Sequence, residues 1–178
     1  MKKLLSALLL GLLVSPSAYS ADAPMGPNNL RIDVQVEQTQ GTSSRMRSSA
    51  GDFSKTDTNR RNLLVRLRRI GSCDPEVNVY AFFVARATSG RISGFYGAGM
   101  QSANVKPADG TLVEFESNDL SANRDRIFDF KFVSGDYPHG WVVLVYQKGR
   151  KVKETGSTPE MLTWFWKNLS KSDAGRLR

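Results

Sequence analysis

The sequence has little of what a small catalytic or metal-binding domain needs, because it holds one cysteine, Cys73, and one histidine, His139, among 178 residues. One residue of each kind cannot supply the ligand set of a zinc site, and a single cysteine forms no disulfide within the chain. Cys73 is then an inert free thiol or half of an intermolecular bridge, which leaves an oligomer open. We predict no metal and no cofactor.

Catalytic motifs are also missing. No Gly-x-Ser-x-Gly motif provides a nucleophile for His139. Residues 94–99 are rich in glycine but lack the Lys-Ser/Thr ending of a phosphate loop, so they predict a glycine-broken strand or bulge. Two carboxylate pairs remain for a hydrolase that uses paired acids, and these are Asp125 with Asp129 and Glu114 with Glu116. Because a solvated strand face explains the second pair equally, we predict that the protein is not an enzyme.

Long hydrophobic runs are absent except near the amino terminus. Two lysines precede an apolar run over residues 4–14, which is shorter than the roughly 20 residues of a membrane-spanning helix. Small residues at the −3 and −1 positions predict a signal peptide over residues 1–20, cleaved between Ser20 and Ala21, with an uncleaved anchor as the alternative. We therefore expect export to the periplasm or the cell surface, and a soluble protein after cleavage.

Positive charge is in excess, with 25 basic and 17 acidic residues and a formal net charge of +8. The predicted signal peptide holds two lysines and no acidic residue, so its removal leaves +6 on 158 residues, the length of one domain. This charge favours acidic proteins, anionic glycans or lipid headgroups as partners. Export argues against nucleic acid.

Apolar residues that alternate with polar ones predict strands along most of the chain. The strands are expected at residues 30–36, 63–67, 77–85, 92–96, 112–116, 127–133, 141–146 and 150–154. Residues 77–85 are apolar on both faces, which indicates a central strand, and residues 136–140 predict a turn. The polar segment over residues 38–61 is either a mobile loop or a poorly patterned hairpin, and we predict that it is mobile.

The carboxyl-terminal part differs from the rest. Residues 157–160 have the pattern of a capping box with proline in the first turn, and apolar residues follow at helical spacing: Leu162, Phe165, Trp166 and Leu169. Trp164 lies off this stripe, as a rim residue or an exposed partner contact. We predict a flexible leader over residues 21–29, one β-sandwich domain with a short C-terminal α-helix over residues 30–170, and a basic tail over residues 171–178.

Two basic stretches form the candidate surface for binding a partner. Arg66 and Arg68 alternate with Val65 and Leu67, so they point away from the core. The whole predicted surface comprises Arg60, Arg61, Arg66, Arg68, Lys148, Arg150, Lys151, Lys153 and Trp164. The alternative is a solvated face whose charges protect a sheet edge from aggregation.

The order of these segments resembles small immunoglobulin-like exported proteins encoded beside type IV pilus-like machinery in verrucomicrobial gut bacteria. The segments that carry the resemblance are residues 30–36, 77–86, 140–152 and 157–168. The resemblance implies an immunoglobulin-like sandwich and a non-enzymatic role as an accessory, assembly or binding module of a pilus-like structure, with a protein partner in the envelope.

Two departures qualify this resemblance. A pilin keeps a long hydrophobic helix after cleavage, whereas the residues after Ser20 are polar, which favours an accessory protein over a fibre subunit. The Cys…Trp…Cys pattern of antibody domains is also absent.

Overall fold

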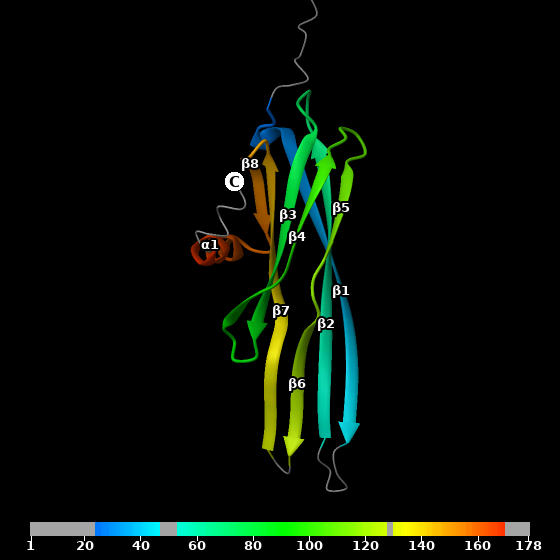
Figure 1. Cartoon of the computed structure of the whole chain (residues 1–178), viewed down its shortest axis with the longest axis vertical. Coiled ribbons are helices and arrows are strands. Elements are labelled where there is room, and N and C mark those ends of the chain that lie inside the picture. Colours follow the sequence, from blue (N-terminus) through cyan, green and yellow to red (C-terminus); the bar gives the residue numbers. More distant parts are fainter. Residues whose placement is uncertain (1–23, 47–52, 128–129, 170–178) are drawn as a thin grey trace, which may run out of the picture.

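The computed structural model describes residues 24–46, 53–127 and 130–169, and most of them form antiparallel strands (Figure 1). The predicted signal peptide, its cleavage site at Ser20 and Ala21, and the tail over residues 171–178 lie outside the described residues. The elements in chain order are η1 Pro27–Asn29, β1 Leu30–Met46, β2 Phe53–Arg69, β3 Glu76–Ala87, β4 Ile92–Asn104, β5 Thr111–Glu116, β6 Leu120–Ile127, β7 Phe130–Gln147, β8 Arg150–Gly156 and α1 Pro159–Asn168.

The upper half of the molecule in Figure 1 is a sandwich of two sheets. One sheet has the order β1-β2-β5, and the other has the order β8-β7-β3-β4. These are the positions of strands A, B and E in one layer and of C, F and G in the other, with β4 added beside the C-type strand. The fold is therefore a mostly β, immunoglobulin-like antiparallel sandwich with one short helix, as predicted.

The polar segment over residues 38–61 is a hairpin, so the expectation of a mobile loop is wrong for its described part. β1 and β2 pair without interruption from Leu30 opposite Arg69 to Met46 opposite Phe53. The other edge of β2 pairs with β5 and then with β6. Backbone hydrogen bonds on both edges hold β2 in place. This segment therefore forms strands although its sequence lacks the apolar alternation that predicts a strand.

β7 passes from one sheet to the other and forms strand where a turn was predicted. Residues 130–135 pair with β6, whereas residues 136–146 pair with β3. The pairing skips His139, because Val84 lies opposite Gly140 and Ala85 lies opposite Pro138. A bulge accommodates the proline and glycine that suggested a turn, so residues 136–140 remain part of the strand.

Below the sandwich, β1, β2, β6 and the first part of β7 continue as one sheet, with no strand of the second sheet facing them (Figure 1). The pattern analysis missed β6, which is mostly polar, and it placed one strand over residues 127–133, where β6 ends and β7 begins. Most described side chains of this extension are exposed or half-buried, whereas Asn59, Leu120 and Ala122 are buried.

Two apolar cores lie on opposite faces of the β8-β7-β3-β4 sheet. The main core fills the sandwich with residues of β2, β3, β5 and β7, among them Leu63, Val65, Val79, Phe83 and Val143. The second core lies under α1. β3 is buried on both faces because it contributes to both cores, which confirms its prediction as a central strand.

Helix α1 has Pro159 in its first turn, as predicted, but its N-cap is Thr158 and not Ser157, the N-cap that the predicted capping box implies. The Oγ1 of Thr158 accepts a hydrogen bond from the backbone N–H of Met161 at 3.2 Å. The buried residues of the helix are Met161 and Phe165, whereas Trp166 is 37% exposed. The buried face of α1 is thus rotated by part of a helical turn from the predicted apolar stripe of Leu162, Phe165, Trp166 and Leu169.

The described part of the predicted leader, residues 24–29, contacts the domain. Met25 is buried, and its backbone N–H donates to Oε1 of Gln147 at 2.7 Å. The amide of buried Gln147 also donates to the carbonyls of Asp74 and Glu76. Residues 24–29 are thereby fixed to the domain. None of the described helices is long and apolar enough to cross a membrane.

Candidate functional site

The arginines of β2 that formed half of the predicted surface lie on two different faces. Arg60, Arg66 and Arg68 alternate with the core residues and point outward from the β1-β2-β5 sheet, with Arg66 opposite Asp33 of β1. Arg60 is already engaged, because it contacts Glu116 at 2.6 Å and Asp119 at 2.7 Å. Arg61 points to the inner face instead.

The cations of the β7–β8 hairpin belong to the other sheet, and several have partners of their own. Lys148 pairs with Asp74 at 2.9 Å, and Lys151 pairs with Glu154 at 2.7 Å while lying 4.4 Å from the ring centre of Trp166. Lys153 donates to the backbone carbonyl of Leu30 at 2.7 Å. Arg150 is exposed. The residues predicted as one surface are thus divided among three faces of the molecule.

Trp164 lies at the rim of the second core. It is half-buried, and its ring meets that of Phe95 edge-on at 5.5 Å. Trp166 is the more exposed tryptophan of α1, with its Nε1 donating to Glu154 at 2.9 Å. Of the two alternatives for Trp164, the structure matches the rim residue.

The single cysteine and the single histidine do not form a reactive pair. Cys73 is 2% exposed, and burial raises the pKa of its thiol. His139 is the exposed residue of the bulge in β7, where desolvation and the positive charges of Arg86 and Arg61 lower its pKa. The burial of Cys73 matches the inert alternative.

Of the acidic residues considered for hydrolysis, the structure describes Glu114, Glu116 and Asp125. Glu114 and Glu116 are exposed on the outer face of β5, and Glu116 is bound to Arg60. The hydrogen bond from Arg60 also lowers the pKa of Asp119, the opposite of what a general acid requires. Asp125 is half-buried in β6, and Asp129 lies outside the described residues.

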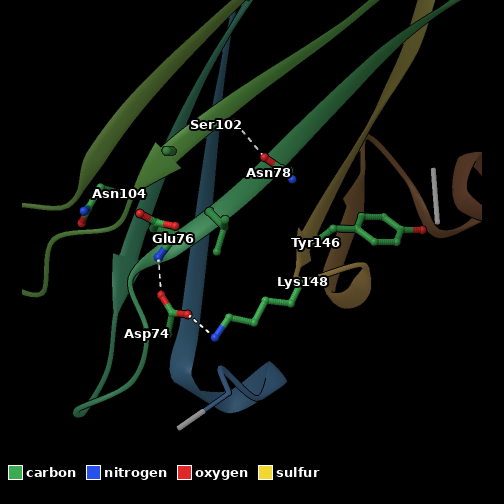
Figure 2. A pocket seen from close by; sticks show the side chains of 9 residues that line it. Asp74, Glu76, Asn78, Ser102, Asn104, Tyr146 and Lys148 are labelled. Carbon is green, nitrogen blue, oxygen red and sulfur yellow. Dashed lines mark hydrogen bonds and ion pairs between the residues drawn. The ribbon is translucent and has the colours of Figure 1, made fainter. Parts of the chain in front are cut away.

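One polar hollow of about 390 Å³ is lined by residues of β3, β4 and β7 and by Asp74 and Lys148 beside these strands (Figure 2). Figure 2 shows Asp74 between the backbone N–H of Glu76, at 3.0 Å, and Lys148. Ser102 donates to Asn78 at 2.8 Å across the neighbouring strands. Because the cation here is paired with one of two carboxylates, this hollow is not suited to an anionic partner.

A second hollow, of about 420 Å³, lies on the inner face of the sheet extension, and we call it the inner groove. Its residues come from four strands: Gln38, Gln40, Gly41 and Thr42 of β1, Lys55, Asp57, Asn59 and Arg61 of β2, Arg124 of β6, and Tyr137 and Pro138 of β7. On β2 these positions continue the face of Leu63, Val65 and Leu67. The face turns from apolar to polar where the second sheet no longer covers it.

Asp57 is the acidic residue among those that line the inner groove. Its carboxylate accepts from Thr42 at 3.1 Å and lies 3.3 Å from Lys55 and 3.3 Å from Arg124. Desolvation opposes ionisation of this carboxyl, but the hydrogen bonds of Thr42 and Lys55 and the charges of Lys55 and Arg124 lower its pKa. Asp57 therefore stays ionised and orients both cations.

Arg61 contributes a third cation, and neutral groups hold it. Its Nε donates to Oε1 of Gln38 at 3.3 Å, and its Nη2 donates to the carbonyl of Pro138 at 3.3 Å. Burial of the half-buried guanidinium lowers its pKa, with Tyr96 acting in the opposite direction, and an arginine remains charged nonetheless. With Lys55, Arg124 and one carboxylate, the inner groove carries a net charge of about +2.

Sequence reasoning named Arg61 but missed the other inner-groove residues. The signal was present, because on β2 the apolar face of Leu63 continues at the same spacing with Arg61, Asn59, Asp57 and Lys55. Because every second residue here is polar, as its neighbours are, the shared face of these side chains is recognised only once the strand is known.

Comparisons with known proteins give distant likenesses alone. No protein-family model and no curated protein matches the chain. Among solved structures, a protein from Akkermansia muciniphila, a verrucomicrobial gut bacterium, is similar at 15% identity and a TM-score of 0.28, over 80% of this chain and 78% of its own. A protein of Bordetella pertussis described as ApaA is similar at 13% identity and a TM-score of 0.26, over 75% of this chain and 95% of its own. No function is taken from either.

Proposed function

We propose that the protein is exported to the cell envelope and acts there without catalysis, by binding an anionic partner. The observation that carries this proposal is the inner groove, where Lys55 and Arg124 pair with the carboxylate of Asp57 and Arg61 adds a third cation held by neutral groups. The excess of basic residues supports the same conclusion, since a positive field attracts acidic partners and raises their rate of encounter.

A salt series tests the binding part of the proposal. The purified protein is expected to bind acidic polysaccharide or anionic vesicles at about 50 mM salt and to lose most of that binding at about 500 mM, where the Debye length falls below roughly 5 Å. Neutral polysaccharide serves as the control. Salt-independent binding, or none to any anionic probe, contradicts the proposal.

Export is tested separately by fractionating cells that produce the full chain. The expected product lies outside the cytoplasm and has an amino terminus at Ala21. A full-length product that stays in the cytoplasm refutes this part.

The absence of catalysis is tested on a broad panel of glycans and esters. The engagement of Glu116 by Arg60 supports a binding role over hydrolysis. A turnover that disappears in Glu114→Gln, Glu116→Gln, Asp125→Asn or Asp129→Asn identifies a hydrolase and overturns the binding module.

A narrower role, as an accessory module of a pilus-like structure, is supported by the resemblance of residues 30–36, 77–86, 140–152 and 157–168. The test is co-purification of pilus-like components with the tagged full chain. A gene neighbourhood without pilus machinery, together with no such partner, removes this role and leaves the anionic binder.

A further inference from the structure

From the inner groove we infer the class of partner: the groove is a subsite for a carboxylated sugar of an acidic polysaccharide. The inference rests on the proposed function and adds the place and the chemistry of recognition. It differs from the surface predicted from sequence, since only Arg61 belongs to both.

The first step is that hydrogen bonds and ion pairs hold several side chains of the inner groove, while the side chain of Arg124 is 53% exposed. Asn59 is 5% exposed, and its Oδ1 accepts from Nε2 of Gln38 at 3.2 Å. The side chain of Asp57 is 15% exposed, and it holds Lys55 and Arg124. Gln38 in turn accepts from Arg61. These bonds form two clusters, one of Gln38, Asn59 and Arg61 and one of Thr42, Asp57, Lys55 and Arg124, and they lower the side-chain entropy that binding costs.

The second step concerns the charge of the ligand. Arg61 is half-buried, and its guanidinium donates hydrogen bonds to a neutral amide and a backbone carbonyl. A desolvated guanidinium bound to neutral acceptors gains most from an anion, and its planar fork fits a carboxylate with two parallel bonds. With Arg124 and Lys55 also lining the hollow, one carboxylate on the ligand offsets about half of the excess charge.

The third step concerns the rest of the ligand. Gln40, Thr42 and Asn59 line the hollow with amide and hydroxyl groups, which both donate and accept hydrogen bonds. Sugar hydroxyls also do both, whereas a lipid phosphate only accepts. A volume of about 420 Å³ lies within the range of small-ligand sites, which is suited to a single sugar and part of its neighbour.

The fourth step is an aromatic surface beside these polar groups. Tyr137 lines the inner groove and also an adjoining hollow of about 460 Å³ that includes Phe53, Phe132 and Val133. The face of a tyrosine packs against the C–H face of a pyranose ring, while its hydroxyl stays in contact with water. The open continuation of the groove leaves room for a polymer to extend past the bound sugar.

The probe is polygalacturonate, and its fully methyl-esterified form is the neutral counterpart. The purified full-length protein is measured by calorimetry at low salt with both polymers, with dextran sulfate and with phosphatidylglycerol vesicles. Arg124→Gln tests the groove, and Arg66→Gln is its matched control, because it removes the same charge from the outer face of the same sheet. Thermal melting checks that both variants are folded.

We expect Arg124→Gln to weaken binding of polygalacturonate about tenfold, as the loss of one charge-assisted hydrogen bond implies, and Arg66→Gln to change it less than about twofold. Tyr137→Leu is expected to weaken it several-fold with no change in charge. Esterification is expected to abolish binding.

Equal losses of polygalacturonate binding in Arg124→Gln and Arg66→Gln would show diffuse electrostatic attraction. This result would refute the inner groove as the binding subsite, but it would not contradict the proposed function. Tighter binding of vesicles or dextran sulfate than of polygalacturonate overturns the assignment to carboxylated sugars. No binding to any anionic probe refutes the proposed function itself.

Discussion

The substitution Phe165→Ala tests whether helix α1 is attached to the sandwich through one side chain. Phe165 is fully buried, and its ring centre lies 4.8 Å from that of Phe82 on β3 and 5.7 Å from that of Phe95 on β4. Truncation removes these contacts and leaves a cavity between the helix and the sheet.

The expected loss in the free energy of unfolding is about 3–5 kcal/mol, the usual effect of Phe→Ala in a packed core. Because α1 has only ten residues, its isolated helical state is marginal, so its order depends on this docking. A domain with a stability of about 5–15 kcal/mol keeps its fold, since the main core lies on the opposite face of the sheet.

Urea denaturation followed by far-ultraviolet circular dichroism and tryptophan fluorescence measures the loss. Trp164 and Trp166 report on the helix itself. The matched control is Lys167→Ala, an exposed residue of the same helix, with an expected change within about 0.5 kcal/mol. A loss below about 1 kcal/mol for Phe165→Ala refutes the docking of α1 by this residue.

Three further predictions concern other parts of the fold. Gly135→Ala is expected to lower the free energy of unfolding, measured by urea denaturation, by at least about 1–3 kcal/mol, because φ is +107° and an added Cβ would lie 2.8 Å from Cα of Ala122. An unchanged denaturation midpoint contradicts this backbone path of β7. Cys73 is expected to react with a thiol reagent far more slowly in the native protein than in urea, because it is buried and its pKa is raised, and non-reducing electrophoresis should show no linked dimer; equal rates refute its burial. The free energy of unfolding is expected to fall on acidification below about pH 4. The backbone N–H of Glu76 and the ammonium of Lys148 lower the pKa of Asp74 below its ordinary value of 3.8, so this stabilisation is present above pH 3.8 and is lost as the pH falls through the folded-state pKa. A melting temperature that stays constant from pH 5 to pH 2 contradicts this prediction.

Local patterns were sufficient where apolar residues marked at least one face of a strand or a helix. The alternation in residues 30–36, the two apolar faces of residues 77–85 and the helical spacing after Pro159 predict elements that the structure confirms. The same reasoning failed for residues 38–61 and for β6, because strands without a covered face need no apolar alternation. It also failed at residues 136–140, because a bulge satisfies the same proline and glycine as a turn does.

For the candidate site, the sequence by itself determined the excess of positive charge and the single cysteine and histidine. Only the tertiary structure decided which cations meet. It sends Arg66 outward and Arg61 inward from one strand, and it brings Arg124 to Asp57 across β2 and β6, 67 residues apart in the chain. The physical reason is that charge is a property of composition, whereas the pairing of distant strands sets which charges share a face.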